Sequence, residues 1–532
     1  MNIELHPAEA PPPTPTAQPG AAYCPDMPPA PTEARTARET RGMRDTWDVI
    51  VIGGGPAGEN AADFAIRGSD RTAVIVENEL VGGECSYWAC IPSKTLLRSV
   101  EMFTEAEGLQ GLATRLSTKG IDVKAVLGRR DEFTSHLDDA GQVKWAKGAG
   151  IDVLRGHGRL TGTRTVQVAD SDGPARDITA RHAVIVATGT SATIPDIPGL
   201  RQALPWTSRD VTNLHQVPRR VAILGGGVVA CEAATWLLGL GVEELTLIDV
   251  GDRILARAEP FAGDLVRRSL EASGAKVITE TKVLEVSRKS PKDNGIGHIS
   301  GGPVTLHIGR RRSIVVDELV VATGRTASTQ DLGLEAVGIA DAVAQAHGYI
   351  RTNDQLQVDG VSGRWLYAVG DVNGRALLTH MGKYQGRIAG AVIAARAGAG
   401  ERAAGKEFRD RASERVVPSV TFTSPEVASV GLTEQAARDL GIDVETVEYD
   451  TSQVSGAALL LDGYVGRAKL VIDRARDVLV GATFVGTGSA ELVHSATVAI
   501  IGGVTLSDLW HAVPSYPTVS EVWLRLLEAR RG

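Results

Sequence analysis

The sequence predicts an α/β fold with two Rossmann-like dinucleotide-binding domains, followed by a C-terminal α+β domain. The paired domains are predicted by a pattern that occurs twice. A short apolar run leads into a glycine-rich loop and then a helical segment, with the loops at residues 53–58 and 225–230. The third domain is predicted by strand-like runs separated by turns, which begin after residue 409 and end in helical segments at residues 489–501 and 520–530.

Length and composition narrow the possible functions. The chain has 532 residues, too many for one core, with 43% hydrophobic and 23% charged residues, as is usual for globular proteins. The net charge of −8 gives no reason to expect nucleic acid, and no apolar run is long enough to span a membrane. Four cysteines are too few for a disulfide framework. One reducible pair in a reducing compartment fits better, so we expect a cytoplasmic protein.

The N-terminal segment, residues 1–45, is rich in proline, alanine and threonine. It has too little apolar surface to fold, so we expect a disordered tail. Cys24 stands alone in this tail and has no second cysteine with which to bind a metal; we assign no metal ligands anywhere in the chain. Met43 precedes the first strand-like run closely, and we hypothesise that it is the true start of the protein.

The first glycine-rich loop is part of a complete dinucleotide-binding fingerprint. Residues 48–52 form the strand, Gly53, Gly55 and Gly58 form the loop, and the next strand ends at Glu77, about 20 residues further on. The glycines allow a tight turn and close approach of the pyrophosphate to the helix N-terminus, and Glu77 can bind ribose hydroxyls. The alternative is a glycine-rich turn in another kind of α/β domain.

The second loop repeats the fingerprint with one change. Gly225 and Gly227 are present, Ala230 replaces the third glycine, and the next strand is followed by Asp249. Asp249 should accept ribose hydroxyls and repel a 2′-phosphate, which favours NADH over NADPH, although Arg253 lies close enough to weaken this preference.

Two Ala-Thr-Gly sequences, residues 187–189 and 322–324, each follow an apolar strand and can close the two dinucleotide-binding domains. They make Thr188, Gly189 and Gly324 candidate cofactor-binding residues. A third apolar run is followed at once by Asp371.

Cys85 and Cys90 form the candidate redox pair, and Gly83 precedes them in a glycine-rich turn. A cysteine pair beside a flavin or nicotinamide site indicates a reversible disulfide that exchanges electrons with the cofactor. The alternatives are an ordinary disulfide and two buried thiols. Residues five apart rise about 7.5 Å along an ideal helix, whereas a disulfide needs Cα atoms within about 6.8 Å. We therefore predict a distorted helix at the pair.

These motifs, in this order, resemble those of the class I pyridine nucleotide-disulfide oxidoreductases: lipoamide dehydrogenase, glutathione reductase and mercuric reductase. The segment CIPSK, ending at Lys94, the Gly-Asp before residue 372 and the run PSVTFTSPEVASVGLTE carry the resemblance. It implies a homodimer with four domains: an FAD-binding domain (46–189), an NAD(P)-binding domain (190–324), a central domain (325–408) and an interface domain (409–532).

The resemblance also implies residue roles. The implied FAD-binding residues are Gly53, Gly55, Gly58, Glu77, Gly83, Lys94, Thr188, Gly189 and Asp371. The implied NAD-binding residues are Gly225, Gly227, Asp249 and Gly324. Glu232 matches a glutamate that pairs with Lys94 beside the flavin N5, where the lysine stabilises reduced flavin. Electrons then pass from NADH through FAD to Cys90, and Cys85 becomes the exposed thiol that attacks a substrate disulfide.

The C-terminal signature departs from the family. Lipoamide dehydrogenase and glutathione reductase carry His-Pro-Thr-x-Ser-Glu, whose histidine acts as a base on the partner's substrate; here Tyr516 replaces the histidine and Glu521 is kept. A phenol with a pKa near 10 is a poor base at neutral pH. Mercuric reductase also has a tyrosine here, but this chain lacks the C-terminal cysteine pair of that enzyme. His511 and His380 are two further histidines, but we do not expect either of them to be the residue that contacts the substrate.

The sequence therefore predicts an FAD-dependent NAD(P)H oxidoreductase of the dihydrolipoamide dehydrogenase type that reduces a small-molecule disulfide. The alternative is a reductase of metal ions or quinones that uses the same flavin and thiols. A redox-sensing protein without catalysis is a third interpretation, which the intact cysteine pair and both glycine-rich loops disfavour.

Overall fold

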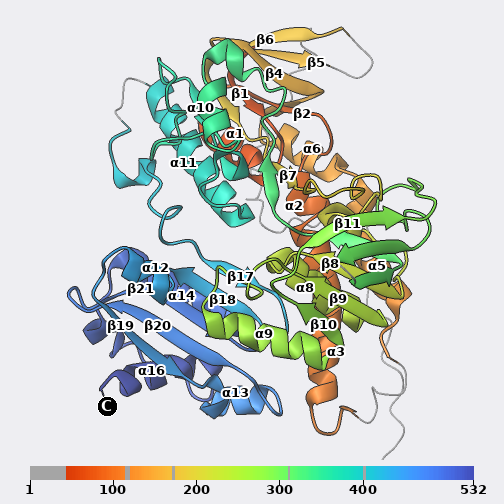
Figure 1. Ribbon diagram of the computed structural model, residues 1–532. Coiled ribbons are helices and arrows are strands. Elements are labelled where there is room, and N and C mark those ends of the chain that lie inside the picture. Colours follow the sequence, from red (N-terminus) through yellow and green to blue (C-terminus); the bar gives the residue numbers. More distant parts are fainter. Residues whose placement is uncertain (1–43, 114–119, 170–173, 310–311, 399–402, 532) are drawn as a thin grey trace, which may run out of the picture.

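A computed structural model describes five stretches of the chain (Figure 1): residues 44–113, 120–169, 174–309, 312–398 and 403–531. Most of the predicted tail, including Cys24 and Met43, lies outside the described residues. The last residue of the tail is nevertheless anchored, because the Asp45 carboxylate pairs with Arg176 at 2.7 Å and its carbonyl accepts the Thr179 N–H. The first strand begins directly after it.

The first dinucleotide-binding unit is built on a seven-stranded sheet in the order β3-β2-β1-β6-β5-β4, with β16 paired to β6. Strands β1, β2, β3, β6 and β16 are parallel, whereas β4 and β5 form an antiparallel extension. The strands are β1 (Thr46–Ile52), β2 (Ala73–Glu77), β3 (Ile151–Arg155), β4 (His157–Gly162), β5 (Thr165–Ala169), β6 (Arg176–Val186) and β16 (Leu366–Ala368). Parallel pairing of a buried strand explains why residues 49–52 of β1 are all apolar.

Strand β1 contributes side chains to two separate hydrophobic cores, because successive side chains point to opposite faces of the sheet. Val49 and Val51 pack with α1 (Pro56–Ile66) and α11 (Thr379–Ala397), while Ile50 and Ile52 pack on the other face. Helices α1 and α11 lie side by side (Figure 1) and approach closely. This packing fixes the position at which α11 begins.

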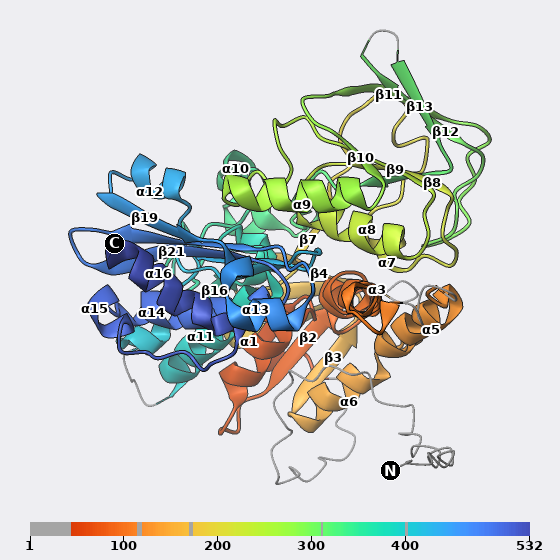
Figure 2. The same cartoon turned by 90° about the horizontal axis from the view of Figure 1, so that it is seen from below.

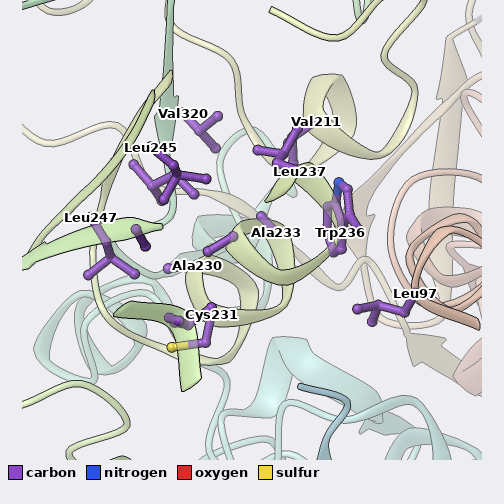
Figure 3. Packing of buried hydrophobic residues seen from close by; sticks show 14 of the residues in the cluster. Leu97, Val211, Ala230, Cys231, Ala233, Trp236, Leu237, Leu245, Leu247 and Val320 are labelled. Carbon is purple, nitrogen blue, oxygen red and sulfur yellow. The ribbon is translucent and has the colours of Figure 1, made fainter. Parts of the chain in front are cut away.

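The second unit is a four-stranded parallel sheet in the order β10-β9-β8-β14. Its strands are β8 (Arg220–Leu224), β9 (Glu244–Ile248), β10 (Ala275–Ile278) and β14 (Glu318–Val321), covered by helices α8 (Val228–Gly239) and α9 (Pro260–Ala272). Figure 3 shows Trp236 and Leu237 of α8 in one apolar cluster with Val211 of α7 (Ser208–Thr212) and Leu97 of α3 (Cys90–Gly108). The second unit is thus packed directly against α3.

The C-terminal domain is a five-stranded antiparallel sheet in the order β17-β18-β21-β20-β19, with α14 and α16 on one face and α12 on the other (Figure 2). Its strands are β17 (Ser419–Thr421), β18 (Val427–Gly431), β19 (Val444–Tyr449), β20 (Arg467–Asp473) and β21 (Val478–Val485). Its helices are α12 (Glu434–Asp439), α13 (Ser455–Leu460), α14 (Leu492–Gly502), α15 (Leu506–Leu509) and α16 (Val522–Arg531). The predicted α/β fold, with two Rossmann-like units and a separate α+β domain, is confirmed.

Several elements have no counterpart in the sequence-based prediction. They are helices α5 (Val123–Phe133), α6 (Ala140–Gly148) and α10 (Ala340–Gln345), and two small antiparallel sheets: β7 (Thr190–Ala192) with β15 (Arg325–Ala327), and β11 (Val283–Arg288), β12 (Val304–Ile308) and β13 (Arg312–Val316). Within the described stretches, we find no helix with the length and apolar character needed to cross a membrane.

Candidate active site

The two cysteines of the predicted redox pair lie at a break between two helices. Helix α2 (Gly83–Tyr87) carries Cys85, and α3 begins at Cys90. The two residues between the helices have φ/ψ of −133°/0° and −136°/−94°, so neither continues a helix. The predicted distortion is confirmed. The two cysteines are not joined by a disulfide, and the Cys85 side chain hydrogen bonds to Cys90.

The Cys90 thiol lies where two long helices begin. Its sulfur is 3.2 Å from the hydroxyl oxygen of Thr379, the first residue of α11. Helix N-termini and nearby cations favour a thiolate. Contact with Cys85, together with the charge of Lys94 and the hydrogen bond with Thr379, outweighs burial and lowers the pKa of Cys90 to about 6. Cys90 is therefore mainly a thiolate at neutral pH.

One turn along α3, Lys94 is fixed by a buried carboxylate. Its ammonium donates to Glu232 Oε2 at 2.7 Å, and the Glu232 side chain is 4% exposed. The second carboxylate oxygen of Glu232 accepts the backbone N–H of Phe422 at 3.0 Å, and the Lys94 Nζ lies 4.9 Å from the centroid of the Phe422 ring. The first unit, the second unit and the C-terminal domain thus meet at one ion pair.

A cavity extends from the first glycine-rich loop to Cys85. Seven of the residues predicted to bind FAD line it: Gly53, Gly55, Glu77, Gly83, Thr188, Gly189 and Asp371. Gly58 lies under the loop instead, where a Cβ would be 2.1 Å from the carbonyl oxygen of Gly53. Lys94 lines a separate cavity of about 840 Å³.

The residues of the first cavity fit a dinucleotide such as FAD. Glu77 ends β2 beside the loop, where its Oε2 accepts the Gly54 N–H at 2.7 Å, and burial raises its pKa. The helix that follows the loop presents its N-terminal N–H groups, which suit a pyrophosphate. Thr188 Oγ1 and Trp88 Nε1, both on the cavity wall, are buried and have no hydrogen-bond partner among the described residues. A bound ligand would supply such partners.

Asp371 also lines this cavity. Thr190 donates to its Oδ2 at 2.7 Å, and the Arg325 Nε lies 3.9 Å from the same oxygen. Burial raises the pKa of Asp371 despite both neighbours. Arg325 also bonds the carbonyl of Thr190 at 2.6 Å, so β7 and β15 hold the acid in place.

The second glycine-rich loop has the same construction as the first. Gly53 has φ +104° and Gly225 has φ +110°, and a Cβ at these positions would lie 2.4 and 2.3 Å from the carbonyl oxygens of Ala187 and Ala322. These alanines begin the two Ala-Thr-Gly sequences. The close approach of each sequence to its loop explains why both keep a glycine at that point.

Around the second loop, Asp249 and Arg253 hydrogen bond to different parts of the backbone. Asp249 Oδ1 accepts the Gly251 N–H at 2.6 Å, and its Oδ2 lies beside Gly226. Arg253 points away and donates to the carbonyl of Ala256 at 2.9 Å. Gly227 is the residue before α8, and Gly324 has φ +136° with open space around it.

Comparisons with known proteins decide the family. Residues 47–398 match the pyridine nucleotide-disulphide oxidoreductases, and residues 417–527 match the dimerisation domain of these enzymes. The chain belongs to this family. Membership makes it an FAD-dependent disulfide oxidoreductase, similar to dihydrolipoyl dehydrogenase, that has a redox-active disulfide and uses a pyridine nucleotide. The sequence-based assignment of the family is confirmed.

Relatives with two different activities match almost the whole chain. A dihydrolipoyl dehydrogenase of Thermus scotoductus is 33% identical over 492 residues, or 91% of this chain and 97% of that protein. A mercuric reductase of Staphylococcus aureus is 30% identical over 478 residues, or 89% of this chain and 81% of that protein. The fold is similar to that of RclA, a HOCl-induced flavoprotein disulfide reductase of Escherichia coli, in its Cu(II) complex. The TM-score is 0.75 at 23% identity, and the match covers 91% of this chain and 99% of that one.

The C-terminal signature lies apart from the redox pair of its own chain. Tyr516, which replaces the family histidine, is 72% exposed. Glu521 is 4% exposed; Arg525 donates to its Oε1 at 2.8 Å, while its Oε2 is buried and has no hydrogen-bond partner in the described residues. His511 is exposed on the same segment. His380 is tied to the carbonyl of Pro418 at 2.9 Å.

Sequence reasoning missed several residues around the pair. Thr379, next to His380, is the residue that reaches Cys90. Arg209 lies over the Trp88 ring, with its Cζ 4.0 Å from the ring centroid, and donates to Glu84 at 2.6 Å. No local pattern identifies them, because each acts on a residue far away in the chain. Cys231, the third described cysteine, is fully buried with a raised pKa.

Proposed function

We propose that this enzyme passes electrons from NADH, through FAD and the Cys85/Cys90 pair, to a small-molecule disulfide, as an enzyme of the dihydrolipoyl dehydrogenase type. The observation that carries the proposal is the Cys90 thiol: it contacts Cys85 and Thr379 and lies one helical turn from Lys94. A half-buried thiol with a pKa of about 6 is suited to redox exchange, whereas an inert core cysteine such as Cys231 has a raised pKa.

FAD, when bound, takes a hydride from the nicotinamide and delivers the electron pair to the disulfide. On this chain, Cys90 is the sulfur that accepts the electrons and is held as the thiolate by its surroundings. Cys85 leaves as the second sulfur and takes up a proton. Cys85 then gives this proton to the substrate sulfur that it displaces and forms a mixed disulfide with the other substrate sulfur. The Cys90 thiolate attacks Cys85 in the mixed disulfide, which restores the pair and releases the second substrate sulfur as a thiolate that takes a proton from solvent.

Lys94 and Glu232 are proposed to act as a unit beside the flavin. The ammonium supplies the positive charge that opposes the negative charge of reduced flavin, and the buried carboxylate holds the ammonium in one position. The bond from Phe422 N–H to Glu232 keeps that carboxylate from rotating.

NADH is the proposed electron donor. The Asp249 carboxylate lies beside the second glycine-rich loop, where a 2′-phosphate would meet its negative charge. Arg253 is the cation that could offset this repulsion, but its guanidinium is bound to the carbonyl of Ala256. None of the hydrogen bonds that Arg253 makes with the described residues reaches the acid.

The proposed active form is a homodimer in which Tyr516 of the partner subunit faces Cys85. Its exposure in the single chain fits a residue that contacts a neighbour. The second candidate function, reduction of a metal ion or a quinone, is favoured by this same tyrosine, because such acceptors need no histidine base. The mercuric reductase relatives fit that candidate.

One experiment tests both candidates. The purified holoenzyme is reduced anaerobically with NADH, and turnover is compared with lipoamide, a quinone and Hg(II) as the acceptor. We expect a long-wavelength thiolate–flavin band after two-electron reduction and the highest kcat/KM with the disulfide. Highest turnover with Hg(II) or the quinone would replace the first candidate by the second. A protein that forms no such band would contradict both.

A further inference from the structure

Helix α7 (Ser208–Thr212), which opens the second dinucleotide-binding unit, contacts the break between α2 and α3. The break leaves the last carbonyls of the short helix α2 without partners in their own helix. Asn213, directly after α7, donates its side-chain amide to the carbonyl of Tyr87 at 3.1 Å, and Thr212 places its hydroxyl 3.2 Å from the carbonyl of Trp88. Both side chains are buried, at 6% and 2% exposure.

Arg209 contacts the same break through Trp88 and Glu84. Its guanidinium lies 4.0 Å over the Trp88 ring, and it donates to Glu84, the residue before Cys85, at 2.6 Å. Two further bonds of 3.0 Å reach Glu79 and fix the fork of the guanidinium. A stacked and forked arginine of this kind restricts both of its partners.

Helix α7 is itself rigidly placed. A capping box between Thr207 and Asp210 closes its N-terminus, and Val211 is buried in the cluster with Trp236 and Leu237 (Figure 3). Asn213 uses its second amide hydrogen on the carbonyl of Arg209 at 3.0 Å. The amide that reaches Tyr87 is therefore anchored to the second unit.

We propose that Asn213 and Arg209 are positioning residues, which hold the helix carrying Cys85 against the start of the helix carrying Cys90 and so set the reduction potential of the pair. This inference rests on the proposed function of the pair. Without the two side chains, α2 keeps fewer contacts with the second unit, and Cys85 meets Cys90 less often. The disulfide then forms less readily, because its stability depends on how closely the fold holds the two sulfurs.

The test is the equilibrium of the holoenzyme with dithiothreitol. The reagent gives two electrons and two protons to the disulfide, becomes its own cyclic disulfide, and leaves two thiols on the protein. We expect Asn213→Ala to shift this equilibrium about tenfold towards the dithiol, which equals about 30 mV. Arg209→Met should shift it in the same direction by about threefold. The rate of Cys90 alkylation against pH should show a higher pKa in Asn213→Ala, because contact with Cys85 is weakened.

The control variant is Gln355→Ala, which removes another side-chain amide bond to a backbone carbonyl, Gln355 to Ala403 at 2.7 Å, away from the pair. It should leave the equilibrium within twofold of wild type. If Asn213→Ala does not fold, Arg209→Lys, which keeps the charge but loses the stacking and the fork, gives the same test at a residue that is 33% exposed.

Equal shifts of the dithiol–disulfide equilibrium in Gln355→Ala and Asn213→Ala would overturn the positioning role. An unchanged equilibrium in Asn213→Ala and in the Arg209 variants would also overturn it. A wild-type protein with no reducible Cys85–Cys90 disulfide would instead contradict the proposed function, before any variant is compared.

Discussion

The redox pair and the C-terminal signature differ in how much of their environment one chain supplies. Around Cys90, the chain provides a hydroxyl, a second thiol and an ammonium held by a buried carboxylate. Tyr516, by contrast, is 72% exposed. The half of the site that receives electrons is organised within a single chain.

This difference indicates which part of the site decides the specificity for the electron acceptor. Residues that take electrons from the flavin must hold sulfur and nitrogen at fixed positions, so they lie on helices packed by three domains. The segment that we propose meets the acceptor is exposed at Tyr516, where a tyrosine in place of a histidine would change the chemistry without disturbing any core. Two relatives of similar identity, one named dihydrolipoyl dehydrogenase and one mercuric reductase, fit this picture.

The largest effect should come from Cys90→Ser. This change removes the sulfur next to the flavin, so the thiolate band should disappear and NADH-dependent disulfide reduction should fall by about 10³-fold or more. The matched variant is Cys85→Ser, which should lose turnover but keep the band, measured by anaerobic NADH titration. A band kept by Cys90→Ser and lost by Cys85→Ser would reverse the roles of the two sulfurs.

Tyr516→His should raise disulfide reduction, because it restores a base with a pKa near neutrality. General base catalysis contributes about 10²- to 10⁴-fold, and we expect a gain near the lower end in kcat/KM for lipoamide. The comparison variant is Tyr516→Phe, which should leave lipoamide turnover within about threefold if the phenol is no base. An unchanged rate in Tyr516→His would mean that the pocket, and not the missing base, excludes lipoamide.

The sequence predicted the half of the site that is encoded locally. Gly53, Glu77, Cys85 and Cys90 belong to runs in which strand, loop and helix follow one another, so local spacing together with the family resemblance indicates the roles proposed for them. The apolar run of residues 49–52 likewise predicts a buried strand without knowledge of its partners.

What the sequence could not predict is contact between distant segments. Thr379 reaches Cys90 across 289 residues, and Asn213 reaches Tyr87 across 126. A threonine and an asparagine at ordinary helix ends give no sign of such a partner. Strands β11 to β13 were missed for a different reason, since β11 exposes Leu284, buries Arg288 and lacks an apolar run like that of residues 49–52 in β1.

A smaller effect concerns pH. The pKa of Cys90 is lowered to about 6, so the thiolate is present above that pH and is protonated as the pH falls through it. Alkylation of Cys90 in the reduced enzyme by iodoacetamide, followed by mass spectrometry, should be about tenfold slower at pH 5 than at its plateau. Because the two thiols are in contact, the midpoint belongs to the pair. A midpoint near pH 9 would contradict the environment described for Cys90.

The smallest effect should appear at the nucleotide site, which, like the surroundings of Cys90, is formed by residues of one chain. Asp249→Ser removes the charge that repels a 2′-phosphate and a ribose ligand of NADH, so the ratio of kcat/KM for NADH over NADPH should fall by about tenfold. Arg253→Ala is the decisive partner variant. Since Arg253 is bound to the carbonyl of Ala256, its removal should change NADPH use by less than twofold. A large loss of NADPH activity in Arg253→Ala would mean that this arginine leaves its carbonyl to bind phosphate, and the preference would then be set by a side chain that moves rather than by the fixed acid.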